Sequence, residues 1–142
     1  MSLEENKAKV CKVIEAINEQ NLDFLDSLTA PDYFDHTHQL NPEGVKQFMN
    51  MIFKAFPDWH ETIEDIIAEG DKVWVRARAT GTHTGEYRGL APTGKKITGM
   101  GVNIYRIVNG KFVEGWAVED WMDFLKQLGV IEYKGFPDEV KL

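Results

Sequence analysis

The stretch Asn103–Gly129 reads NIYRIVNGKFVEGWAVEDWMDFLKQLG, and two β-type segments in it flank the dipeptide Asn109-Gly110. Both residues of a type I′ turn need positive φ angles, which Asn and Gly tolerate best, so the dipeptide predicts a β-hairpin with a two-residue loop. Such a loop fixes which residues of the two strands face each other. Counting outward, the predicted pairs are Val108 with Lys111, Tyr105 with Glu114, Asn103 with Trp116, Gly101 with Val118 and Gly99 with Asp120.

One face of the predicted hairpin combines acids, aromatic rings and an amide, and it carries Asn103, Tyr105, Glu114, Trp116 and Asp120. Because glycine has no side chain, Gly99 leaves a space beside the carboxylate of Asp120. A carboxyl group beside apolar walls is suited to general acid–base catalysis, since burial disfavours its ionised form. Asp120 is therefore the predicted catalytic residue, with the alternative that it caps the helix that follows it.

The rest of the chain predicts helices first and an antiparallel meander afterwards, which indicates the α+β class, with a curved sheet packed over the N-terminal helices. Ser2 and the pair Asn41-Pro42 are typical of helix starts. The expected helices cover residues 3–19, a short segment from Leu22 toward Pro31, residues 42–56 and residues 121–128. The expected strands cover residues 60–68, 72–82 and 96–108 and the second arm of the hairpin. We expect one domain over residues 1–142, with a core at about 3–130 and a tail at 131–142.

Composition excludes several classes of function. Sixteen basic against twenty-three acidic residues give a net charge of −7, which opposes nucleic acid or an anionic membrane as a partner. Cys11 is the single cysteine, so no intramolecular disulfide can form. The polar N-terminus does not resemble a secretion signal, and no apolar run is long enough to span a membrane. A cytoplasmic protein is expected.

Five segments together resemble a known family: Ala55–Trp59, Glu69–Arg76, Gly81–Gly85, Gly89–Gly94 and Gly110–Trp116 followed by Asp120 and Gln127–Gly129. Over residues 3–130 the chain resembles the SnoaL-like polyketide cyclases, within the nuclear-transport-factor-2-like superfamily. The resemblance implies a cone-shaped fold, a homodimer and a hydrophobic pocket for a small carbonyl substrate. It also implies an intramolecular aldol cyclisation that needs no cofactor, with Asp120 at the position of the acid.

Two departures from the family keep alternatives open. Many relatives carry a histidine directly before the tryptophan and an aspartate directly after it, whereas this chain has Gly115 and Ala117. This difference favours a dimer that binds an apolar ligand without chemistry. Isomerisation, dehydration or hydrolysis are further alternatives, because one fold hosts many reactions.

Further residues are predicted to contact the substrate, in addition to those of the hairpin: they are Tyr33, His36, Arg78 and His83. Arg76 is expected to pair with Asp65, whereas Arg78 faces Ile63 and is left to bind a carbonyl or carboxylate. His36 matches a histidine of the relatives, and His38 is expected to be exposed. These two histidines alternate on an extended segment, but no third ligand follows at a diagnostic spacing, so no metal site is predicted.

Overall fold

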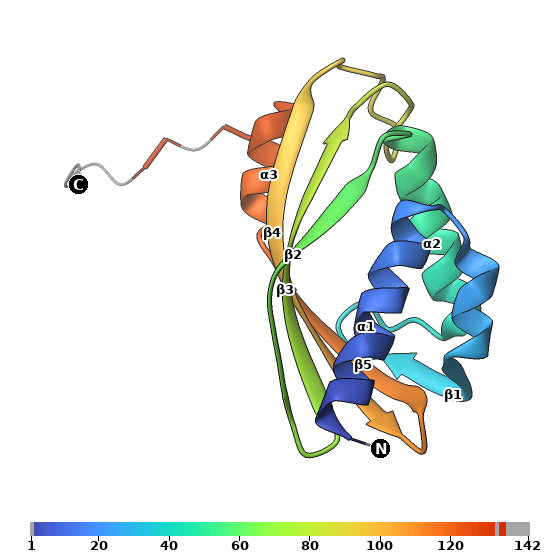
Figure 1. The fold of residues 1–142 in the computed structure, drawn as a ribbon. Coiled ribbons are helices and arrows are strands. Elements are labelled where there is room, and N and C mark those ends of the chain that lie inside the picture. Colours follow the sequence, from blue (N-terminus) through green and yellow to red (C-terminus); the bar gives the residue numbers. More distant parts are fainter. Residues whose placement is uncertain (1, 133, 136–142) are drawn as a thin grey trace.

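The computed structural model describes residues 2–132 and 134–135, and it confirms the α+β class (Figure 1). Its elements in chain order are α1 (Leu3–Asn18), the 3₁₀ helix η1 (Leu22–Ser27), β1 (Thr29–Asp35), α2 (Pro42–Ala55), β2 (His60–Glu69), β3 (Lys72–Thr82), β4 (Lys96–Val108), β5 (Lys111–Glu119) and α3 (Trp121–Leu128). The predicted tail at residues 131–142 lies outside the described residues except for 131, 132, 134 and 135.

The two long N-terminal helices begin where their capping residues predict. Ser2 Oγ accepts a hydrogen bond of 3.1 Å from the backbone N–H of Glu5 at the start of α1. Asn41 Oδ1 accepts one of 2.8 Å from Gly44 at the start of α2, and Pro42 occupies the first helical position. Each cap satisfies a backbone donor that has no partner inside its own helix.

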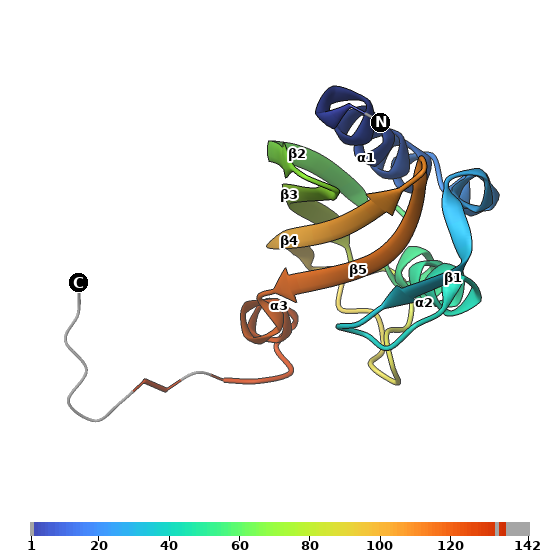
Figure 2. The same cartoon turned by 90° about the horizontal axis from the view of Figure 1, so that it is seen from below.

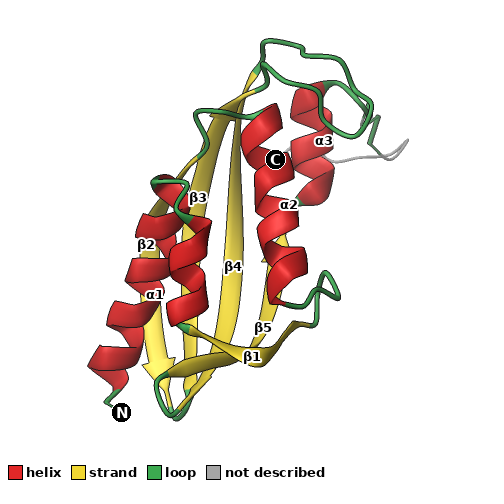
Figure 3. Cartoon of the chain, turned by 90° about the vertical axis from the view of Figure 1, so that its right-hand side faces the viewer, coloured by secondary structure: helices red, strands yellow, loops and turns green. Residues whose placement is uncertain are grey.

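The described strands form one five-stranded sheet in the order β1-β5-β4-β3-β2. β1 runs parallel to β5, and the other neighbouring pairs are antiparallel. The sheet is curved and does not close on itself, and α1 and α2 lie along its concave face (Figures 1 and 2). Figure 3 shows α3 near one end of α2, just after β5 ends. We call the face of the sheet toward α1 and α2 the inner face and the opposite one the outer face.

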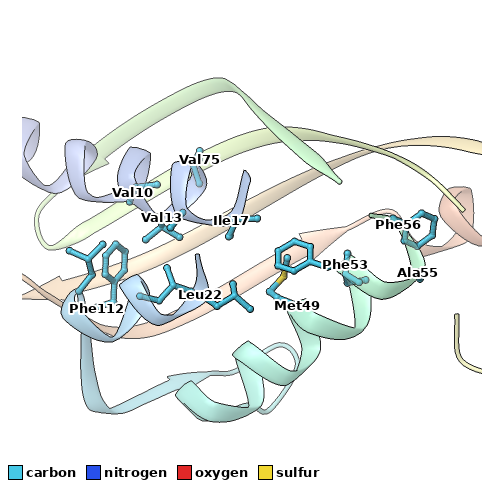
Figure 4. Packing of buried hydrophobic residues seen from close by; sticks show 14 of the residues in the cluster. Val10, Val13, Ile17, Leu22, Met49, Phe53, Ala55, Phe56, Val75 and Phe112 are labelled. Carbon is cyan, nitrogen blue, oxygen red and sulfur yellow. The ribbon is translucent and has the colours of Figure 1, made fainter. Parts of the chain in front are cut away.

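The hydrophobic core fills the space between the inner face and these helices (Figure 4). Val10 of α1 is fully buried. Val73 and Val75 are also fully buried, because alternate residues of β3 point inward. Phe56, at the end of α2, is also fully buried and packs against Phe124 of α3 with 5.8 Å between ring centroids. This contact holds α3 against the open end of the sheet.

The predicted register of the hairpin is correct only next to the turn. Asn109 and Gly110 have φ angles of 50° and 78°, and Val108 pairs with Lys111 as predicted. Val113 is then an extra residue in β5, a β-bulge, and it shifts every later pair by one position. The observed partners of Tyr105, Asn103 and Gly101 are Gly115, Ala117 and Glu119, so the predicted pairing of these residues with Glu114, Trp116 and Val118 is wrong.

A second bulge changes the hairpin of β2 and β3. Asp65 pairs with Arg76 and Ile66 with Val75, as predicted. Beyond Asp65 the register shifts at Glu64, so Arg78 pairs with Thr62 and not with Ile63. The sequence shows the turn that starts each hairpin but not the bulge that changes its register.

Candidate functional site

The middle of the inner face carries only small residues. Ala79 of β3 pairs with Gly99 of β4, and Ala77 pairs with Gly101, so four small residues lie together. A cavity of about 230 Å³ lies between this floor and the helices. Its apolar walls include Val13 and Ile17 of α1, Phe48, Met49 and Ile52 of α2, and Trp121 and Phe124 of α3.

A few polar side chains interrupt the apolar lining of this cavity. They are Tyr33 and Asp35 of β1, Glu61 of β2, Asn103 and Tyr105 of β4, Glu119 at the end of β5 and Asp120 next to it. An apolar cavity with a few polar groups is the usual form of a small-molecule site. The floor of small residues therefore makes room for a ligand, and these groups surround it.

Glu119 faces the cavity because the bulge at Val113 turns it inward, opposite Gly101. Burial raises the pKa of its carboxyl group, and the Asp35 charge adds to the increase, while His38 opposes it. The sequence predicted Asp120 opposite Gly99, and it did not predict Glu119 as a residue of the site. No local sequence signal reveals the change, because a bulge is not visible in the alternation of the strand.

Glu61 is a second half-buried carboxyl group and lies across the floor, where it pairs with Ala79. Trp59 Nε1 donates a 3.1 Å hydrogen bond to Glu61 Oε1. Burial raises the pKa of Glu61 and the charge of Glu119 raises it further, although the hydrogen bond from Trp59 acts in the opposite direction. Carboxyl groups with raised pKa values are suited to proton transfer near neutral pH.

Tyr33 explains the glycine at position 115. A Cβ atom at Gly115 would overlap the hydroxyl group of Tyr33, which crosses from β1 to β5. Tyr33 is 9% exposed, and burial raises the pKa of its phenol, an effect that Asp35 reinforces. The absence of a side chain at Gly115 therefore leaves room for the tyrosine of the neighbouring strand.

The structure brings five of the predicted site residues to the cavity: Tyr33, Asn103, Tyr105, Trp116 and Asp120 line it. Among the described residues, the lining does not include His36, Arg78, His83 or Glu114. Trp116 lies at the border, because its ring stacks on that of His36 with centroids 5.0 Å apart. His36 Nε2 also lies 3.1 Å from Oε1 of Glu114, a residue of β5.

Arg78 and His83 have other partners. Arg78 lies 3.2 Å from Glu64 Oε1, so the expectation that it faces no carboxylate is wrong. His83 is fully buried, and its Nδ1 accepts a 3.1 Å hydrogen bond from the backbone N–H of Thr93. His83 thereby connects the end of β3 to the loop that precedes β4.

Asp120 caps α3, as the alternative prediction had it. Its Oδ1 accepts a 3.0 Å hydrogen bond from the backbone N–H of Asp123. The residue is exposed at the edge of the cavity. The cap leaves one carboxylate oxygen of Asp120 free for a ligand, so both predicted roles are compatible with its position.

The prediction that His38 is exposed is wrong, because its side chain is only 20% exposed. His38 Nδ1 lies 2.9 Å from Asp35 Oδ2, and Nε2 lies 3.1 Å from Glu119 Oε1. The ring thus lies between two carboxyl groups that line the cavity. The described residues include no group of three His, Cys, Asp or Glu side chains arranged to hold a metal ion. Within residues 2–132 and 134–135, no helix has the length and apolar character needed to cross a membrane.

The curved open sheet, the helices on its concave face and the cavity between them define a nuclear-transport-factor-2-like α+β protein. A family model described as SnoaL-like polyketide cyclase matches residues 8–128. The chain belongs to the SnoaL-like polyketide cyclase family.

Individual relatives agree with this membership. The chain is 29% identical to nogalonic acid methyl ester cyclase from Streptomyces nogalater, over 82% of this chain and 92% of that one. It is 31% identical to aklanonic acid methyl ester cyclase DnrD from Streptomyces peucetius, over 87% of this chain and 82% of that one. The crystal structure of AclR from Streptomyces galilaeus superposes with a TM-score of 0.84 at 32% identity, covering 92% of this chain and 100% of that chain.

Proposed function

We propose that this protein closes a ring in a polyketide-like carbonyl substrate by an intramolecular aldol reaction that needs no cofactor. The observation that carries the proposal is the apolar cavity of about 230 Å³ with carboxyl groups at the end of β5. Membership of the family supports it, since two relatives are named as cyclases of nogalonic and aklanonic acid methyl esters.

In the proposed reaction, Asp120 takes a proton from a carbon atom flanked by carbonyl groups. The electron pair of the C–H bond forms an enolate, whose carbon attacks a second carbonyl carbon of the same molecule. The resulting alkoxide is then protonated. Asn103 and Tyr105 lie on the inner face and would donate hydrogen bonds to the enolate oxygen. Burial raises the pKa of the Tyr105 phenol well above its usual value, which keeps the hydroxyl protonated as a donor.

The test is turnover of aklanonic acid methyl ester and nogalonic acid methyl ester by the purified protein. Ring closure leaves the mass unchanged, so the product is separated by chromatography and identified by NMR. Asp120→Asn should lower kcat by about 10²-fold or more while keeping the fold, because asparagine also caps helices well. Asp123→Asn, three residues into the same helix, is the matched control and should retain kcat. Unchanged turnover in Asp120→Asn would exclude Asp120 as the acid.

A binding protein without chemistry is the second candidate. Gly115 and Ala117 favour it, because both positions face inward and neither supplies a polar side chain. Such a protein would bind the esters in a fluorescence titration of its tryptophans but would release them unchanged. An isomerase, dehydratase or hydrolase would instead convert them to a different product, which the same chromatography detects.

We also propose that two copies associate through the outer face. Ile67, Trp74 and Ile104 are paired in one row across three strands, and Ile67 and Trp74 are 64% and 48% exposed. Large exposed apolar patches mark interfaces. Sedimentation should give twice the chain mass of 16.2 kDa, and Trp74→Lys should give one chain mass. A monomeric wild-type protein would contradict the dimer.

A further inference from the structure

Glu119 is one of the carboxyl groups placed against the floor of the cavity. It is the last residue of β5, and its strand partner Gly101 has no side chain to cover it. Its side chain is 30% exposed, and it belongs to the cavity lining. A bound molecule on the floor of small residues would therefore touch Glu119.

Two residues from another part of the chain hold Glu119 in place. Asp35 ends β1, and its Oδ1 accepts hydrogen bonds from the backbone N–H groups of Thr37 and His38, of 2.9 and 3.1 Å. This turn brings Nδ1 of the His38 ring to 2.9 Å from Asp35 Oδ2. The other side of the ring reaches Glu119 Oε1 at 3.1 Å, and Phe48 of α2 packs against it with centroids 5.2 Å apart.

The order of these three residues decides where a proton can reside. Asp35 is an acceptor when ionised, so the Nδ1 of His38 carries a proton toward it. The Nε2 of His38 lies 3.1 Å from Glu119 Oε1, within ion-pair distance of this carboxyl group. A charge on His38 therefore acts directly on the protonation of Glu119.

We propose that Glu119 is a second catalytic carboxyl group, the general acid of the ring closure, and that His38 and Asp35 position it. The inference rests on the proposed function. Asp120 takes the proton from carbon, and the enolate carbon forms the new C–C bond to the second carbonyl carbon. The π electrons of that carbonyl move to its oxygen, which takes the proton from Glu119. Exchange with water then returns a proton to Glu119 and removes one from Asp120.

The environment of Glu119 favours this division of roles. Burial raises the pKa of Glu119, which keeps the group protonated at higher pH than an exposed glutamate. Asp120, by contrast, is exposed at the edge of the cavity. Paired carboxyl groups in different environments commonly divide acid and base roles. The titratable groups around Glu119 are Asp35, His38, Glu61, Tyr87 and Tyr105.

The first experiment compares Glu119→Gln with wild type on aklanonic acid methyl ester. Loss of a positioned general acid should lower kcat by about 10²–10⁴-fold with little change in KM. Glu69→Gln, an exposed substitution at the far end of β2, is the matched control. If wild type turns over the ester and Glu119→Gln keeps its kcat, Glu119 is not the acid and the cyclase function stands. If wild type turns over neither ester, the proposed function fails, and the role of Glu119 fails with it.

The second experiment tests the positioning role of His38. Because Glu119 must be protonated, kcat should fall as pH rises through its pKa. His38 lowers that pKa, so His38→Gln should move this limb of the pH profile to higher pH. The carboxyl ¹³C signal of Glu119 should show the same upward shift in the protein without substrate. A limb and a signal that do not move in His38→Gln would overturn the positioning role.

Discussion

The two faces of one sheet use charged residues in different ways. On the outer face, Arg76 donates a 2.7 Å hydrogen bond to Asp65, and Arg106 lies 3.2 Å from Glu114. The side chains of both pairs are partly exposed to water. On the inner face, Glu61 and Glu119 lie among apolar side chains, and burial is the main cause of their raised pKa values. Water screens the outer ion pairs, so each has a small effect, whereas the inner carboxyl groups retain strong interactions.

This difference shows that residue type alone does not assign a role. Glu114 and Glu119 are glutamates on the same strand, five positions apart in the sequence, yet one joins an outer ion pair and the other lines the cavity. The bulge at Val113 sets which face each of them occupies. Four predictions test the contrast between the faces.

Deletion of Val113 should have the largest effect. Without the bulge, each later residue of β5 would turn to the opposite face, so Glu119 would point outward. The space that Gly115 leaves for Tyr33 would also be lost. We expect a loss of more than about 4 kcal/mol of stability, seen as loss of dispersed NMR signals or of a cooperative thermal transition. A deletion variant with the wild-type Tm would show that the bulge does not set the faces.

Gly115→Ala should have the next largest effect. The added Cβ overlaps the Tyr33 hydroxyl group, and overpacking of this kind costs about 1–3 kcal/mol in urea unfolding. Gly99→Ala is the matched control, because a Cβ there meets nothing within 4 Å. Tyr33→Phe should recover part of the loss in the double variant. Equal stability of the two alanine variants would contradict the tight contact.

The pH dependence of stability should have opposite signs for Glu61 and for Asp58. Burial raises the pKa of Glu61 in the folded state above its pKa in the unfolded state. Glu61 therefore stabilises the fold below its unfolded-state pKa, and this contribution is lost as the pH rises through the folded-state pKa. Hydrogen bonds from Thr82 lower the pKa of Asp58, so its contribution is present at high pH and lost on acidification. Between about pH 4 and about pH 8, Glu61→Gln should gain stability relative to wild type and Asp58→Asn should lose it. Urea unfolding at both pH values measures this, and slopes of the same sign would refute it.

Arg78→Gln should have the smallest effect. The ion pair of Arg78 with Glu64 is exposed on both sides, and such pairs contribute about 0–1 kcal/mol. We expect a change in stability of less than about 0.5 kcal/mol and no change in KM for the ester. A large rise in KM would instead place Arg78 in the substrate site, as its sequence position suggested.

Five of the residues that line the cavity could be predicted, and the two that were missed have different causes. Tyr33, Asn103, Tyr105, Trp116 and Asp120 were predicted from the sequence and line the cavity. Glu119 and His38 were missed. The first depends on a bulge, and the second depends on a turn at Asp35 that brings β1 beside β5, far away in the sequence.

Local sequence signals were enough to predict the class of the fold, the helix starts and the turns, because caps, proline and the Asn-Gly dipeptide act through local backbone preferences. They also predicted that Gly99 leaves a space beside a carboxyl group. The tertiary structure alone decided which carboxyl group faces the cavity. One extra residue in a strand turns every later side chain over, and only the pairing of β5 with β4 and β1 selects the strand position that accepts it.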